Sequence, residues 1–91
     1  MLVLSMKTGT TCKIGNDVLE YVAEKPDFGL FLLNSEPVKL KPQEMTDFGQ
    51  YKIGVSLFRP YGRKDHVRIA IDAPKEIKIL RHNAGVSFAK V

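Results

Sequence analysis

Apolar and polar residues alternate with a period of two along most of this chain, which is the spacing of half-buried β-strands. The alternation is most regular over residues 2–6, 53–57 and 67–71, and the β-branched residues of the last segment favour a pleated surface. Further short strands are predicted over residues 12–14, 18–23, 30–33, 38–41 and 75–81. The pattern therefore predicts a mainly β protein, a small antiparallel sheet with almost no helix.

Clusters of Gly, Pro and small polar residues separate the predicted strands. The turn at residues 8–11 contains Gly9, so we expect the first two strands to form an opening hairpin. Residues 59–65 contain Pro60 and Gly62 and predict a second turn, between residues 53–57 and 67–71. Two prolines bracket residues 38–41, which predicts an edge strand because Pro cannot donate to a strand ladder.

Length and charge narrow the class of protein. Ninety-one residues form a single domain, 1–91, whose core is marginal without a partner chain. The net charge is +4, and it lies at the two ends of the chain: residues 1–17 carry +1, residues 18–66 are neutral and residues 67–91 carry +3. A basic surface of this kind favours a polyanionic partner.

Residues that carry chemistry are scarce. Cys12 has no second thiol with which to form a disulfide, and its position on a strand indicates a buried structural residue. His66 and His82 have no neighbours at metal-ligand spacing and are expected on the surface. We therefore expect no catalytic residues, no metal, no cofactor and no enzyme activity. The chain has neither a long apolar run nor a signal-peptide pattern, so we expect a soluble cytoplasmic protein without a membrane partner.

Two blocks of sequence carry a resemblance. The first block, residues 1–18, contains Met1-Leu-x-Leu4, Lys7-x-Gly-x-Thr11 and Ile14-Gly15. The second block, residues 67–81, contains Val67-Arg-Ile69, Ala73-Pro-Lys-Glu76 and the strand-end Arg81. Together these blocks resemble the carbon storage regulator (CsrA/RsmA) family.

The resemblance implies a post-transcriptional, translational regulator that binds Gly-Gly-Ala sequences in mRNA 5′ leaders and small regulatory RNAs. It also implies an intertwined homodimer of five-stranded chains, each ending in a short helix. The RNA-binding surface would combine the first strand of one chain with the last strand of the other. Carried over by position, the implied RNA contacts are Leu4, Ser5, Met6, Lys7, Ile79, Leu80 and Arg81.

Three features depart from the family pattern. Met6 stands where the family usually has a basic residue, and residues 82–85 do not continue as a helix. Residues 19–66 are much longer than the corresponding family segment; residues 51–58 would replace part of its second strand, which leaves residues 19–50 as an insertion. These departures keep open an alternative function, a protein-interaction module that binds an unknown protein through the insertion.

Overall fold

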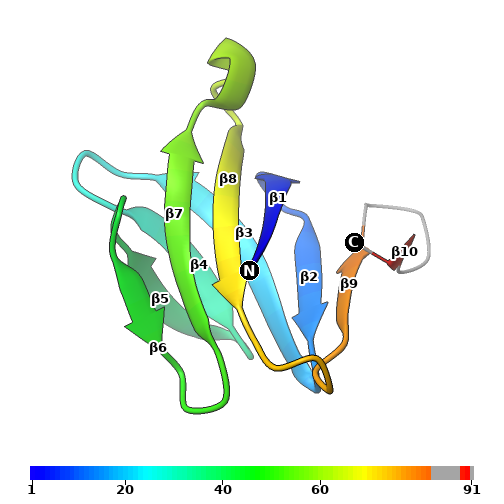
Figure 1. Cartoon of the computed structure of the whole chain (residues 1–91). Coiled ribbons are helices and arrows are strands. Elements are labelled where there is room, and N and C mark those ends of the chain that lie inside the picture. Colours follow the sequence, from blue (N-terminus) through cyan, green and yellow to red (C-terminus); the bar gives the residue numbers. More distant parts are fainter. Residues whose placement is uncertain (83–88, 91) are drawn as a thin grey trace.

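The computed structural model describes residues 1–82 and 89–90, which fold as two antiparallel sheets (Figure 1). The prediction of a mainly β protein is confirmed. In chain order the elements are β1 (Leu2–Lys7), β2 (Thr11–Ile14), β3 (Asp17–Glu24), β4 (Gly29–Leu33), β5 (Glu36–Leu40), β6 (Met45–Asp47), β7 (Lys52–Phe58), the 3-10 turn η1 (Pro60–Gly62), β8 (His66–Asp72), β9 (Ile79–His82) and β10 (Ala89–Lys90). Within the described residues, no helix is long and apolar enough to span a membrane.

The two sheets form two layers. One sheet has four strands in the order β1-β8-β7-β6, and the other has six strands in the order β10-β9-β2-β3-β4-β5. In Figure 1 the four-stranded sheet stands in front of β3, β4 and β5, while β2 and β9 lie to one side. Each sheet thus has one face toward the other layer and one face toward solvent.

A single apolar core lies between the layers, and alternation along the strands supplies it. The four-stranded sheet contributes Leu4, Met6, Ile53, Val55, Val67, Ile69 and Ile71, and the six-stranded sheet contributes Cys12, Ile14, Leu19, Tyr21, Phe31 and Leu40. These side chains are every second residue of their strands, which is how a period of two fills one face of a sheet.

The segment predicted as an insertion is part of this core. It supplies β4, β5, β6 and most of β3. Tyr21 and Phe31 are fully buried, with ring centroids 5.0 Å apart. The predicted edge strand is β5, which ends the six-stranded sheet and contains Pro37. The strands of residues 19–50 and the blocks 1–18 and 67–81 therefore share one interior.

The predicted opening hairpin is wrong, because β1 and β2 belong to different sheets. Gly9 has a φ of 86°, and the backbone N–H of Thr10 donates to the carbonyl of Lys7 (3.0 Å), so the turn itself forms as expected. Beyond it, β1 pairs with β8 while β2 pairs with β3 and β9. Both strands bury alternate apolar side chains in the same core, and placing them in opposite layers achieves this.

The last predicted strand is shorter than expected and begins at Ile79 instead of residue 75. The N–H of Ile77 donates to the carbonyl of Pro74 (3.1 Å), which closes a turn where the alternation predicted a strand. Ile77 still packs against the core. An apolar residue within a turn therefore continued the alternation of apolar and polar positions, which made the turn look like a strand in the sequence. The expected absence of a C-terminal helix concerns residues 83–88 and 91, which lie outside the described residues.

Candidate nucleic-acid interface

The four predicted RNA-contact residues of the first block divide between the two faces of β1. Leu4 and Met6 point into the core and are 5% and 1% exposed, whereas Ser5 and Lys7 point outward. In the single chain the side chains of Leu4 and Met6 therefore belong to the core. Ser5 and Lys7 remain available to a ligand.

The outer edge of β1 is unpaired within the described residues, because β8 pairs on one side only. The N–H of Thr8 donates to the carbonyl of Asp65 (2.8 Å), the residue opposite it. Thr8 is therefore a position whose backbone groups point toward β8. Since antiparallel ladders alternate, the backbone groups of Val3 and Ser5 point away from β8. This edge thus presents free donors and acceptors beside Lys7.

The predicted contacts of the second block lie on β9, in the other sheet. Ile79 packs against the core, and Leu80 lies opposite Lys13 on the outer face. Arg81 lies opposite Cys12 of β2 and is half-buried. Strands β1 and β9 are not paired with each other, so a single chain does not join the two halves of the implied RNA site. Their union through a second copy stays a prediction.

Cys12 behaves as a structural residue. It is fully buried, and burial raises the pKa of its thiol to about 11, although the neighbouring Arg81 guanidinium lowers it. The thiol is therefore protonated at neutral pH and is a poor nucleophile. The expectation of a buried Cys12 is confirmed.

The outer side of the four-stranded sheet exposes the apolar side chains of Val3, Met45 and Leu57 and, beside them, a group of polar and basic side chains that we call the basic face. It is formed by Ser5, Lys7, Tyr61, His66 and Arg68. Ser5 lies directly opposite Arg68, and Lys7 lies opposite His66. The guanidinium carbon of Arg68 lies 5.5 Å from the centroid of the Tyr61 ring.

One carboxylate lies at the end of the basic face. The Oδ1 atom of Asp65 is 2.8 Å from Nδ1 of His66, and its Oδ2 atom is 3.9 Å from Nζ of Lys7. The hydrogen bond with His66 is the main cause that lowers the pKa of the Asp65 carboxyl. Sequence reasoning missed Tyr61, His66 and Arg68, although an aromatic residue inside a basic turn was a visible signal.

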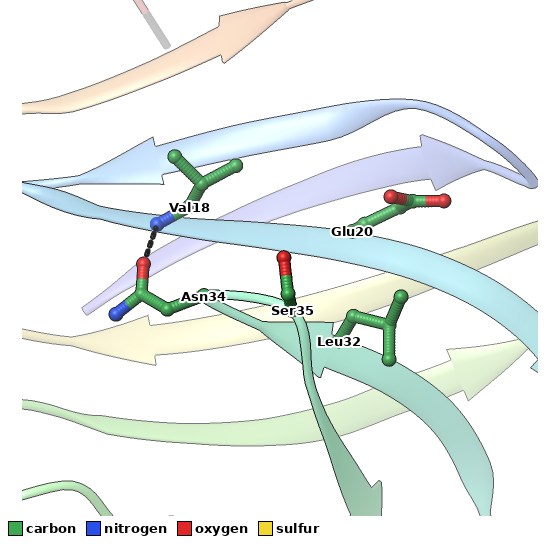
Figure 2. A pocket seen from close by; sticks show the side chains of 5 residues that line it. All are labelled: Val18, Glu20, Leu32, Asn34 and Ser35. Carbon is green, nitrogen blue, oxygen red and sulfur yellow. Dashed lines mark hydrogen bonds between the residues drawn. The ribbon is translucent and has the colours of Figure 1, made fainter.

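The outer side of the six-stranded sheet differs in character, and we call it the apolar face. Its exposed or half-exposed apolar side chains are Val18, Leu30, Leu32, Pro37 and Leu80. Figure 2 shows a pocket on this face, lined by Val18, Glu20, Leu32, Asn34 and Ser35. Asn34 closes one side of the pocket, where its Oδ1 atom accepts from the N–H of Val18 (3.0 Å).

A polar group ties the two sheets together near one end. The hydroxyl of Tyr51, just before β7, donates to Oδ2 of Asp17 (2.6 Å), and the amide of Asn34 donates to Oδ1 (2.8 Å). These two hydrogen bonds lower the pKa of the Asp17 carboxyl, Tyr51 contributing most. Burial and the same carboxylate raise the pKa of Tyr51. We interpret this group as a structural link between the two sheets, because its hydrogen bonds join residues of the group to one another.

In the part of the chain that the structure describes, no three His, Cys, Asp or Glu side chains gather as metal ligands would. Comparison of the chain with protein-family models, curated proteins and solved structures finds no match.

Proposed function

We propose that this chain binds single-stranded RNA with Gly-Gly-Ala-type motifs, in mRNA leaders or small regulatory RNAs, as a post-transcriptional regulator. The free edge of β1 carries this proposal. The backbone groups of Val3 and Ser5 point outward there, next to the exposed ammonium of Lys7. Unpaired bases expose their hydrogen-bonding edges, and a strand edge offers donors and acceptors at regular spacing.

Two features of the sequence agree with this reading. The blocks that resemble the carbon storage regulator family include β1 and most of β9, and each still has a basic residue there, Lys7 and Arg81, although Met6 replaces another. The same resemblance favours a homodimer, in which Arg81 of a second copy would complete the site at the β1 edge. Bound over a ribosome-binding site, such a dimer would block translation sterically.

The test is a gel-shift titration of the full chain with a hairpin RNA that has Gly-Gly-Ala in its loop. A second hairpin with that triplet replaced measures selectivity. Arg81→Ala should cost about 1–3 kcal/mol of cognate binding if the guanidinium reads a base, and the preference for the cognate loop should relax. A phosphate contact would instead weaken both RNAs alike.

Lys41→Ala is the matched control, since Lys41 is exposed beyond β5 and far along the sequence from both blocks. Its affinity should equal that of the wild type. If Arg81→Ala stays folded and binds the cognate hairpin as the wild type does, Arg81 has no part in recognition and the proposal loses its central side chain.

A second candidate function is a protein-interaction module, and the apolar face favours it. Val18 is 37% exposed and borders the pocket with Leu32; Leu32 lies in residues 19–50, and Val18 is the last residue of the first block, on the strand that continues into them. Exposed apolar surface of this kind is typical of a protein contact. If the wild-type chain binds neither hairpin, this candidate replaces the first.

A further inference from the structure

Tyr61 is the most exposed large hydrophobic side chain of the described residues, with 89% of its surface open to solvent. It lies in the turn between β7 and β8, which projects beyond the ends of these strands in Figure 1. Leaving an aromatic ring in water forgoes the free energy that burial would release. An exposed ring at a projecting turn therefore requires an explanation outside the core.

The backbone of this turn adopts costly conformations. Arg59 and Tyr61 have φ values of 52° and 56°, in the left-handed region that L-residues other than Asn and Asp seldom occupy. Gly62, the neighbour with a φ of 75°, takes the same region without a steric cost. Such strain persists where surrounding structure enforces it, and it concentrates at binding sites.

The surrounding structure does enforce this conformation. The N–H groups of Gly62 and Arg63 donate to the carbonyls of Arg59 (2.9 Å) and Pro60 (3.1 Å). Pro60 is buried, and the guanidinium of Arg59 contacts the carboxylate of Glu24 on β3 at 3.0 Å. The turn is anchored on both sides, so the backbone that carries Tyr61 is held in place before any ligand arrives.

One cation contacts the exposed ring, and two more follow it in the turn. The Arg68 guanidinium lies 5.5 Å from the ring centroid, within the range of a cation–π contact. Arg63 and Lys64 follow in the same turn; both are exposed, and no side-chain partner is found for either within the described residues. Asp65, which precedes β8, is paired with His66, and Glu24 on β3 is paired with Arg59.

We propose that Tyr61 and Arg68 form a stacking platform for one unpaired base of RNA, with Arg63 and Lys64 binding the adjacent phosphates. Because Ser5 lies opposite Arg68, the platform continues from the β1 edge across the basic face. An RNA bound at that edge would extend a flanking nucleotide onto Tyr61. This inference rests on the proposed function and adds a contact that tolerates any base, since every base has an aromatic face.

The chemistry of the ring favours RNA over a protein ligand here. A protein interface of Tyr and Arg would need apolar neighbours to form its dry centre. The Tyr61 ring instead contacts the Arg68 guanidinium, and Arg63 and Lys64 follow it in the same turn, while Leu57 on β7 is an exposed apolar side chain opposite Arg68. Aromatic rings interleaved with basic side chains are typical of single-strand binding surfaces.

The test uses fluorescence anisotropy with the full chain and a labelled single-stranded RNA that carries Gly-Gly-Ala and a flank of several nucleotides on each side. Tyr61→Ala should weaken binding about 5- to 150-fold, the range for losing one stacked base. Tyr61→Phe keeps the ring and should bind as the wild type does. Arg68→Ala should weaken binding and reduce its dependence on salt.

A matched cation–π pair on the six-stranded sheet provides the control. There the ammonium of Lys39 lies 5.1 Å from the centroid of the Phe28 ring. Lys39→Ala and Phe28→Ala should leave RNA affinity unchanged. If these two variants weaken binding as much as the Tyr61 and Arg68 variants, the loss reflects general charge or stability and the platform is refuted.

Tyr61→Gly separates binding from folding. Glycine adopts a φ of 56° easily, so this variant should melt no lower than the wild type while it loses RNA affinity as Tyr61→Ala does. If the wild type binds the RNA and the Tyr61→Ala and Tyr61→Gly variants bind it equally well, the platform is wrong and the proposed function stands. Should the wild type bind no RNA at all, the proposed function itself fails.

Discussion

The two solvent-facing sides of this molecule are built on the same core and differ in the outward side chains that they present. The basic face presents Lys7, Arg68 and the exposed Tyr61 ring on strands from the family-like blocks and the turn between β7 and β8. The apolar face presents Val18 and Leu32, largely on strands of the insertion. Each side also carries the other kind of side chain: Val3, Met45 and Leu57 are exposed on the four-stranded sheet, and Lys13, Glu20 and Lys39 lie on the outer face of the six-stranded sheet.

Residues 19–50 contribute to both sides, because they supply most of β3 and all of β4 and β5 to the six-stranded sheet and β6 to the edge of the four-stranded sheet. The inward side chains of β3 and β4 fill the shared core, whereas their outward side chains form a new, nearly neutral surface. Two functions are compatible with such a division, one on each face. Variants that affect the core, the link between the layers or one face alone distinguish these contributions.

The largest effect is expected from the core of the insertion. Phe31 is fully buried between the sheets, so Phe31→Ala should destabilise the protein by about 3–5 kcal/mol through lost burial and the cavity left behind. In a chain this small, that is a large part of the total stability. Urea denaturation measures the change.

Leu32→Ala is the matched control, because Leu32 is the next residue of β4 and points to the apolar face. It should cost less than about 1 kcal/mol. If Phe31→Ala costs no more than Leu32→Ala, the insertion packs loosely and the two faces do not share a core.

The strands could be predicted where alternation coincided with burial. Val67, Ile69 and Ile71 are all buried, as their spacing required. Pairing could not be predicted, because alternation fixes which face of a strand is apolar and leaves its neighbours open. The hairpin error arose in this way, since β1 and β2 each have a suitable apolar face but bury it from opposite layers.

The candidate site was predictable only in part. Met6 stands where the resemblance implies a basic residue, yet its side chain is 1% exposed in this chain. Sequence spacing did place Ser5 and Lys7 on one face, opposite the buried residues. Tyr61 was overlooked because its turn was interpreted from Pro60 and Gly62, and exposure depends on backbone angles that the sequence does not display.

An intermediate effect is expected from the link between the layers. Tyr51→Phe removes the hydroxyl that donates to Asp17 and should cost about 1 kcal/mol at neutral pH, allowing for the partial exposure of the pair. In the folded protein the pKa of the Asp17 carboxyl lies below 3.8, the ordinary value for an aspartate side chain. Its stabilising contribution is therefore complete above that pH and is lost as the pH falls toward the folded pKa.

The difference in unfolding free energy between wild type and Tyr51→Phe should accordingly shrink when urea denaturation is repeated at pH values progressively below 3.8. Tyr61→Phe is the control, since its hydroxyl is on an exposed ring and its removal should change stability at neither pH. A Tyr51→Phe difference that is constant across this range would mean that the Asp17 carboxylate does not contribute through this hydrogen bond.

The smallest effect on stability is expected from the apolar face, and it tests the separation of functions directly. The double variant Val18→Ser, Leu32→Ser removes apolar side chains that border solvent, so it should change the free energy of unfolding by about 1 kcal/mol or less. Its RNA affinity should equal that of the wild type, because neither residue lies on the basic face. Anisotropy and urea denaturation of the same preparation measure both quantities.

A loss of RNA affinity without a loss of stability would mean that RNA also crosses the six-stranded sheet. A loss of stability that grows with protein concentration would mean that a second copy covers this face, because mass action makes the stability of an associated protein depend on its concentration.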